Sequence, residues 1–267
     1  MPVKDATKRF SSRVDDYARC RPGYPPEIIE LLKKECGLTP DSLIADIASG
    51  TGIFTRMLLE NGNRIFGVEP NEEMRRAGER FLADYPRFKS IVGTAEATTL
   101  PDHSVGFVTA AQAAHWFNRE NARLEFIRIL KPGGWLVLVW NDRRMDATEF
   151  QRDYEQLLRT YGTDYELVRR HGMALAVETL FTEPFQTRTF EYMQTLDYAG
   201  LEGRLLSSSY TPQKDHPQYN PMLHELRRIF DRHQLNGMVS FDYDTRVYYG
   251  RLDDIPQKQA DLKQSGY

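Results

Sequence analysis

The chain has 267 residues, of which 40% are hydrophobic and 27% charged, and its formal net charge is −3. These values are typical of a soluble globular protein, and we expect a single domain over residues 1–267. Two cysteines, Cys20 and Cys36, are too few for a disulfide framework, and the apolar runs fall short of the roughly 20 residues of a membrane helix. The slightly acidic charge balance argues against binding of nucleic acid through phosphates. We therefore expect a cytoplasmic monomer or homodimer with no nucleic-acid and no membrane partner.

Helices and strands alternate along the first half of the chain. Apolar residues recur there either at helical spacing or in short continuous runs typical of buried strands. Helices are expected at 26–36, 53–62, 71–85 and 119–130, and strands at 42–48, 63–70, 88–96, 105–114 and 135–141. Runs that are apolar on both faces favour a parallel sheet with helices on each side. The crossover rule then predicts a doubly wound α/β sheet.

The C-terminal part has a different pattern. A strand is expected at 186–196, a helix at 224–234 and a long strand at 238–252. Alternation in the last of these would place one set of side chains on a single face: Val239, Phe241, Tyr243, Thr245 and Val247. We expect segments 185–193 and 216–252 to complete the sheet. We expect 142–184 and 194–215 to be insertions that cap its ligand edge.

A glycine-rich loop follows the first strand. Asp46 ends that strand, Gly50 and Gly52 follow, and Glu69 ends the next strand. In an open α/β sheet, ligands bind outside the carboxyl ends of the strands, where glycines let the backbone approach closely. A carboxylate at the second strand end can accept two hydrogen bonds from a ribose diol. The loop and the acid together indicate an adenosine-type ligand.

Two ligand classes fit this loop. A dinucleotide site expects a third glycine, and residues 53–55 hold none. Asp46 would repel a pyrophosphate, but it would suit a sulfonium group. This electrostatic argument favours S-adenosylmethionine (SAM) over NAD, unless Asp46 points away and caps backbone amides.

At this point the sequence resembles class I SAM-dependent methyltransferases of the small-molecule type, which include trans-aconitate methyltransferase-like proteins. The resemblance covers roughly residues 10–141 and rests on five motifs in order. They are Asp46 with Gly50 and Gly52, Val68-Glu69-Pro70, Gly93 to Glu96 with Leu100-Pro101-Asp102, Ala111 to Phe117, and Leu130 to Gly134. It implies a mostly parallel, seven-stranded, Rossmann-like sheet with an antiparallel C-terminal strand and helical cap insertions. It also implies a lid in residues 1–25, a SAM-binding core in residues 26–141 and S-adenosylhomocysteine (SAH) as the product.

The resemblance assigns cofactor roles residue by residue. Gly50 and Gly52 would pass under the methionine part, and Glu69 would bind both ribose hydroxyls. The other implied cofactor residues are Tyr17 and Arg21 in the lid, Asp46, Ala48 and Ser49 in the first motif, Pro70, Ala95 and Glu96 around adenine, and Gln112 near the sulfonium. Ala48 stands where the family usually has glycine, and its methyl group should be tolerated if the residue keeps a negative φ.

The methyl acceptor would lie beyond the fourth and fifth strands. Trp116, Trp140 and Asn141 are candidates for its pocket, with Trp140 as plain core the alternative. His115 is the candidate general base, because an imidazole can take a proton from a hydroxyl, thiol or amine. The alternative is a loop histidine that supports Trp116. The histidines show no metal-ligand spacing, so no metal is expected.

Four arginines in the insertions and neighbouring strands are candidates to bind an anionic acceptor, and the alternative for each is an ordinary surface arginine: Arg143, Arg144, Arg188 and Arg204. We expect an enzyme that methylates an O, N or C atom of a small molecule, with a carboxylate among the acceptors. The rivals are an NAD-linked oxidoreductase, a nucleic-acid methyltransferase and a SAM-binding protein without catalysis.

Overall fold

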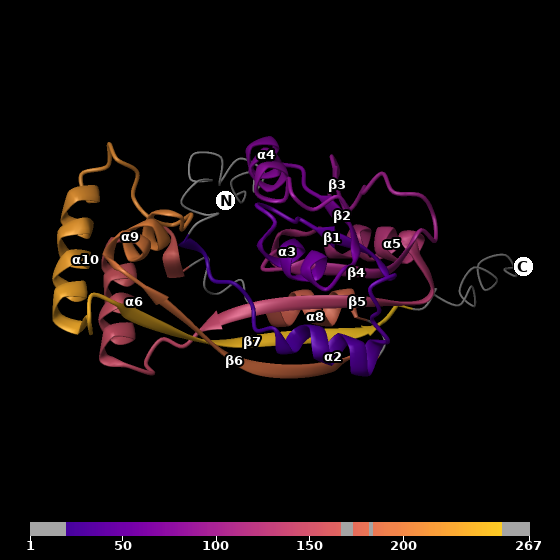
Figure 1. Ribbon diagram of the computed structural model, residues 1–267. Helices are drawn as coiled ribbons and strands as arrows, with labels where there is room; N and C mark the ends of the chain where they lie inside the picture. Colours follow the sequence, from indigo (N-terminus) through magenta and orange to yellow (C-terminus); the bar gives the residue numbers. More distant parts are fainter. Residues whose placement is uncertain (1–19, 167–172, 182–183, 253–267) are drawn as a thin grey trace, which may run out of the picture.

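The computed structural model describes residues 20–166, 173–181 and 184–252 (Figure 1). Their strands form one seven-stranded sheet in the order β3-β2-β1-β4-β5-β7-β6. The strands are β1 (Leu43–Ile47), β2 (Arg64–Val68), β3 (Phe88–Ile91), β4 (Val105–Ala111), β5 (Leu130–Arg143), β6 (Gln186–Leu196) and β7 (Val239–Arg251). The first five pair in parallel, and β7 is antiparallel to both β5 and β6. The predicted α/β fold with an antiparallel last strand is confirmed.

Helices cover both faces of this sheet. The helices of the core are α2 (Glu27–Cys36), α3 (Ile53–Glu60), α4 (Glu72–Phe81), α5 (Arg119–Ile129) and α8 (Met173–Leu180). Apolar residues of α2 and α3 pack on one face, and those of α5 and α8 pack on the other. Such two-sided burial explains why the central strands are apolar throughout. In the described part of the chain, no helix is long and apolar enough to cross a membrane.

Most expected elements are present, with shifted ends. Helix α4 ends at Phe81 instead of residue 85, because Leu82 leaves the helical region and residues 82–85 form a turn. Strand β5 starts at Leu130 instead of 135, and its pairing with β4 is irregular between Val105 and Phe107. In β7 the residues expected to share one face are all buried, so the alternation predicted its orientation correctly.

A second group of helices lies beyond the carboxyl end of β5 (Figure 1). It consists of α6 (Glu149–Tyr161), α9 (Tyr198–Leu206) and α10 (Tyr219–His233). Their apolar faces pack around the far part of β7, in a core separate from the two cores on the sheet. We call this group the cap. Because β5, β6 and β7 extend into the cap, it is built on the same sheet as the glycine-rich loop.

Candidate functional site

Asp46 lies at the carboxyl end of β1 and is almost fully buried. Its carboxylate accepts hydrogen bonds from the Thr55 hydroxyl on α3 (2.5 Å) and from the Thr109 hydroxyl on β4 (2.8 Å). Burial raises the pKa of Asp46 to about 6, although both hydrogen bonds act in the opposite direction. Asp46 thus joins β1 to two neighbouring elements through side chains, not through backbone amides. The polar Thr109 inside the apolar run of β4 is the sequence signal that could have revealed this contact.

The loop between β1 and α3 has a left-handed backbone at three positions. φ is 53° at Ala48, 57° at Gly50 and 87° at Gly52. The condition set for tolerating the Ala48 methyl group, a negative φ, is therefore not met. A residue with a Cβ atom in this region carries a strain of about 1–2 kcal/mol. Backbone hydrogen bonds hold the loop, from the Ser49 N–H to the Val68 carbonyl and from the Gly52 N–H to the Ser49 carbonyl.

Helix α4 supports the same loop from outside. A Cβ atom at Gly78 would lie 2.9 Å from the Gly50 carbonyl oxygen, so glycine is required for this approach. At Gly52 a Cβ atom would lie 2.7 Å from the Leu82 side chain. A glycine within a helical pattern indicates close packing, and Gly78 is such a signal that sequence reasoning missed. Gly52 also begins α3 without a side-chain cap, which leaves first-turn N–H groups on the side of the loop.

Glu69 follows β2 and is only 6% exposed. One carboxylate oxygen accepts a hydrogen bond from the Gly50 N–H (2.9 Å), and the other accepts one from the Asn71 N–H (2.8 Å). Burial raises the pKa of Glu69, while these two backbone bonds act to lower it. A carboxylate has about four lone-pair positions, so each oxygen can accept one further hydrogen bond. Glu69 thus fixes the glycine-rich loop and still has acceptors for a diol.

The adenine-side candidates follow the neighbouring strands β2 and β3. Pro70 comes directly after Glu69 and is half-buried. Thr94 and Ala97 exchange backbone hydrogen bonds (3.1 and 3.3 Å), so Ala95 and Glu96 form the tip of a tight turn. Ala95 is buried, and Glu96 accepts a hydrogen bond from the Asn118 N–H at the start of α5 (2.8 Å). The Glu96 carboxylate is therefore partly used in fixing the turn.

Aromatic rings gather where β4 and β5 end. His115 lies in the 3-10 turn Ala114–Trp116, and its ring centroid is 4.4 Å from that of Trp116. The Trp140 ring stands edge-on to His115 at 5.0 Å. Gln112 has a left-handed φ of 59°, its N–H donates to the Val139 carbonyl, and its side chain donates to the Asn141 carbonyl at 3.3 Å. The structure thus brings these predicted pocket residues to one edge, and Gln112 carries backbone strain of the kind common at functional sites.

The start of the described chain is attached to this edge. The Asn141 side chain donates to the Gly23 carbonyl (2.8 Å) and accepts from the Thr245 hydroxyl (2.7 Å). Arg21 donates to the Ser207 carbonyl at the end of α9 (2.9 Å), so it contacts the cap. Arg21 was expected among the cofactor residues of the lid, and this hydrogen bond directs its guanidinium toward α9. Tyr17 lies outside the described residues.

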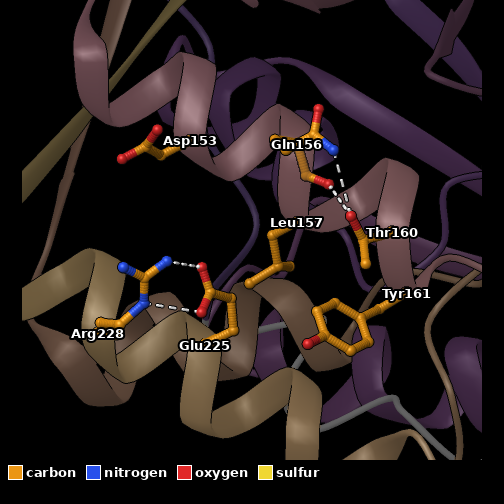
Figure 2. A pocket seen from close by; sticks show the side chains of 7 residues that line it. All are labelled: Asp153, Gln156, Leu157, Thr160, Tyr161, Glu225 and Arg228. Atoms are coloured by element: carbon orange, nitrogen blue, oxygen red, sulfur yellow. Dashed lines mark hydrogen bonds and ion pairs between the residues drawn. The ribbon is translucent and has the colours of Figure 1, made fainter.

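A polar surface pocket lies between α6 and α10, as Figure 2 shows. In it Arg228 pairs with Glu225 at 2.5 Å, and none of the predicted site residues lines it. Among the described residues, no group of three or more His, Cys, Asp or Glu side chains is arranged to hold a metal ion. The carboxyl edge of the sheet is therefore the candidate active site.

Comparisons with known proteins agree with this fold. The family model described as "Methyltransferase domain" matches residues 45–138, which run from β1 into β5. An uncharacterized methyltransferase of Mycobacterium tuberculosis is 36% identical over 186 residues, which are 69% of this chain and 68% of the relative. The chain belongs to this methyltransferase family. An uncharacterized methyltransferase of Schizosaccharomyces pombe is 28% identical over 90% of this chain and 96% of its own length.

A solved structure shares the fold of this methyltransferase. It is the "Putative Type II Methyltransferase" of Anaeromyxobacter dehalogenans, with a TM-score of 0.63 and 22% identity over 87% of this chain and 98% of that one. The methyl donor of this enzyme class is SAM. The residues at the carboxyl edge fit it. Glu69 has an acceptor left on each oxygen for two ribose hydroxyls, and Gly50 and Gly52 allow a close backbone approach.

Proposed function

We propose that this methyltransferase transfers the methyl group of SAM to an O, N or C atom of a small-molecule acceptor by in-line displacement. One observation carries the proposal. The loop 48–52 follows β1, and the His115 aromatic group follows β4, the strand paired in parallel beside it. A cofactor on the first would lie next to an acceptor on the second, because parallel neighbours end at the same edge.

The cofactor roles follow from the contacts described above. Glu69 would bind the ribose hydroxyls, Pro70, Ala95 and the free oxygen of Glu96 would lie along adenine, and the loop 48–52 would contact the methionine part. Asp46 is a buried carboxylate that supports the loop by accepting hydrogen bonds from Thr55 on α3 and Thr109 on β4. Gln112 would lie near the reacting sulfur, because it directly follows β4 at the carboxyl edge of the sheet.

SAM supplies an activated methyl group on a sulfonium, so the protein contributes position, exclusion of water and, where needed, a base. Alignment within about 3–3.5 Å of the methyl carbon can supply on the order of 7–11 kcal/mol of the acceleration. Trp116 and Trp140 flank the His115 ring and would wall the acceptor. His115 would accept a proton from a hydroxyl, thiol or amine acceptor, and it would orient a carboxylate, which needs no base.

SAH release measured over an acceptor panel tests this proposal. We expect turnover with a small molecule, and a loss of about 100-fold or more in kcat for His115→Gln if the acceptor must lose a proton. His224→Gln, an exposed histidine on α10, is the matched control and should keep full activity. Binding of SAM without turnover of any acceptor would favour the rival function, a SAM-binding protein without catalysis.

A further inference from the structure

Two of the four arginines named from the sequence are buried in the cap. Arg144 pairs with Asp244 and Glu191 at the surface, and Arg188 is exposed on β6. Arg204 on α9, in contrast, is only 7% exposed, and the Arg143 side chain at the end of β5 is 11% exposed. The alternative of an ordinary surface arginine therefore does not hold for Arg143 and Arg204.

Arg204 has little to compensate its charge. Its only hydrogen bond from the guanidinium in the described part of the chain goes to the Tyr243 hydroxyl at the long distance of 3.5 Å. Among the described residues its buried Nε atom has no acceptor, and its charge interacts with tyrosines, not with a carboxylate. The guanidinium carbon lies 6.0 Å from the centre of the Phe241 ring, a contact that offsets part of the charge. Buried charges are normally paired, so Arg204 is an exception that requires a cause.

Two further donors that find no acceptor among the described residues lie around the same ring. Arg143 Nη2 donates to Glu155 (2.7 Å), while its buried Nη1 atom has no acceptor in that part of the chain. The Arg143 guanidinium carbon is 5.9 Å from the Phe241 ring centre and 5.1 Å from that of Tyr154. The buried Tyr154 hydroxyl likewise has no partner within residues 20–166, 173–181 and 184–252, and the Tyr154 ring lies 4.8 Å from Phe241. Three donors, two of them cationic, thus surround one aromatic ring.

The charges of this cluster do not balance. Arg143 and Arg204 carry two positive charges, and Glu155 supplies one negative charge. Burial raises the pKa of Tyr154 to about 12, so its hydroxyl keeps the proton at pH 7 and remains a donor. Counted over the described residues, the cluster therefore lacks one negative charge and acceptors for three N–H or O–H groups. A carboxylate has one negative charge and about four lone-pair positions, whereas a phosphate would bring a second charge.

The cluster adjoins the candidate active site. Arg143 lies two residues after Asn141 on β5, and side chains two apart on a strand share a face. The Asn141 side chain donates to the Gly23 carbonyl, and the Arg21 guanidinium donates to the Ser207 carbonyl. Ser207 lies three residues after Arg204 in the chain. The donors are thus on the cap side of the edge where β4 and β5 end.

We propose that Arg204, Arg143 and Tyr154 form a subsite for a carboxylate group of the methyl acceptor, remote from the atom that is methylated. This subsite rests on the proposed function, because it names the class of acceptor: a small-molecule carboxylate. Shielding from water strengthens charge-assisted hydrogen bonds, so the subsite would select acids over their neutral amides.

Binding of simple acids tests the subsite without knowledge of the natural acceptor. The probes are acetate, succinate and phenylacetate, each compared with its amide, at up to tens of millimolar, by calorimetry and thermal unfolding with and without SAH. We expect at least one acid to stabilise the protein and its amide not to do so. Arg204→Gln should weaken binding of that acid about tenfold or more, and Tyr154→Phe by a few fold.

Controls separate this role from a structural one. Arg227 on α10 also stacks on an aromatic ring, 4.6 Å from the centre of Tyr198, but its side chain is 55% exposed, so Arg227→Gln should leave acid binding unchanged. Without an acid present, Arg204→Gln and Tyr154→Phe should unfold at no lower temperature than the parent protein, because each removes an unpaired buried group. Equal binding of acids and amides, no acid binding, or full acid binding by Arg204→Gln would overturn the subsite. Failure of SAH to bind would instead refute the proposed function.

Discussion

Replacement of Glu69 by glutamine changes one atom and disturbs two functions of this side chain. In the structure, both carboxylate oxygens accept backbone N–H groups, from Gly50 and Asn71. A glutamine keeps one acceptor oxygen, but its NH2 group must face the other N–H group. The variant therefore loses one charge-assisted hydrogen bond and leaves a buried donor without an acceptor.

The expected magnitude follows from these contacts. An unsatisfied buried donor costs about 1–3 kcal/mol. Removal of the buried charge offsets part of this loss of stability, because burial opposes ionisation of Glu69 and raises its pKa. We expect a net loss of about 1–3 kcal/mol in the free energy of unfolding. The ribose diol also loses one acceptor, which should raise the Kd for SAH by about 10- to 100-fold.

Two measurements separate these effects. Denaturant unfolding without ligand gives the stability loss, and calorimetric titration with SAH at a temperature where the variant is folded gives the affinity loss. Glu79→Gln is the control, because Glu79 lies on α4 with a side chain that is 43% exposed and contacts Arg75 at 3.8 Å. An unchanged Kd in folded Glu69→Gln protein would refute the assignment of Glu69 to the ribose.

Three further predictions concern the support of the glycine-rich loop. In the folded protein the pKa of Asp46 is about 6, above its usual 3.8, so the folded state binds the proton more tightly than the unfolded state. The protein therefore loses stability as the pH rises from about 4 to 6. Asp46→Asn should abolish this loss of about 3 kcal/mol in ligand-free protein, and an unaltered pH profile of unfolding would contradict the burial argument. Ala48→Gly should leave the free energy of unfolding unchanged or raise it by up to about 1 kcal/mol, whereas Ala48→Val should lower it, both measured by thermal unfolding. A valine variant more stable than the glycine variant would refute the left-handed backbone at Ala48. Gly78→Ala should lower both the unfolding temperature and SAH affinity, because its Cβ atom would press on Gly50, and an unaffected variant would show that α4 does not support the loop.

The sequence predicted the core of the fold well because its signals are local. Apolar runs on both faces indicated the parallel strands, and alternation in β7 gave its buried face. The order of the motifs placed the glycine-rich loop, Glu69 and His115 at strand ends of one edge.

The remaining features depend on contacts between distant segments. The backbone at Ala48 is set by hydrogen bonds and packing from β2 and α4, so its left-handed φ could not be predicted from neighbouring residues. The partners of Asp46 come from α3 and β4, and the burial of Arg204 depends on the packing of α9 against β7. A single arginine in a sequence does not show whether it faces water, and this is why the cap cluster was not distinguished from surface charge.

Titration of the purified protein with SAM and, in parallel, with NAD distinguishes the two ligand classes that the glycine-rich loop could bind. We expect saturable heat with SAM and with SAH at one site per chain, a rise in unfolding temperature with both, and no heat with NAD. Folded protein that gives neither heat nor a thermal shift with SAM or SAH, or that binds NAD instead, would contradict this expectation.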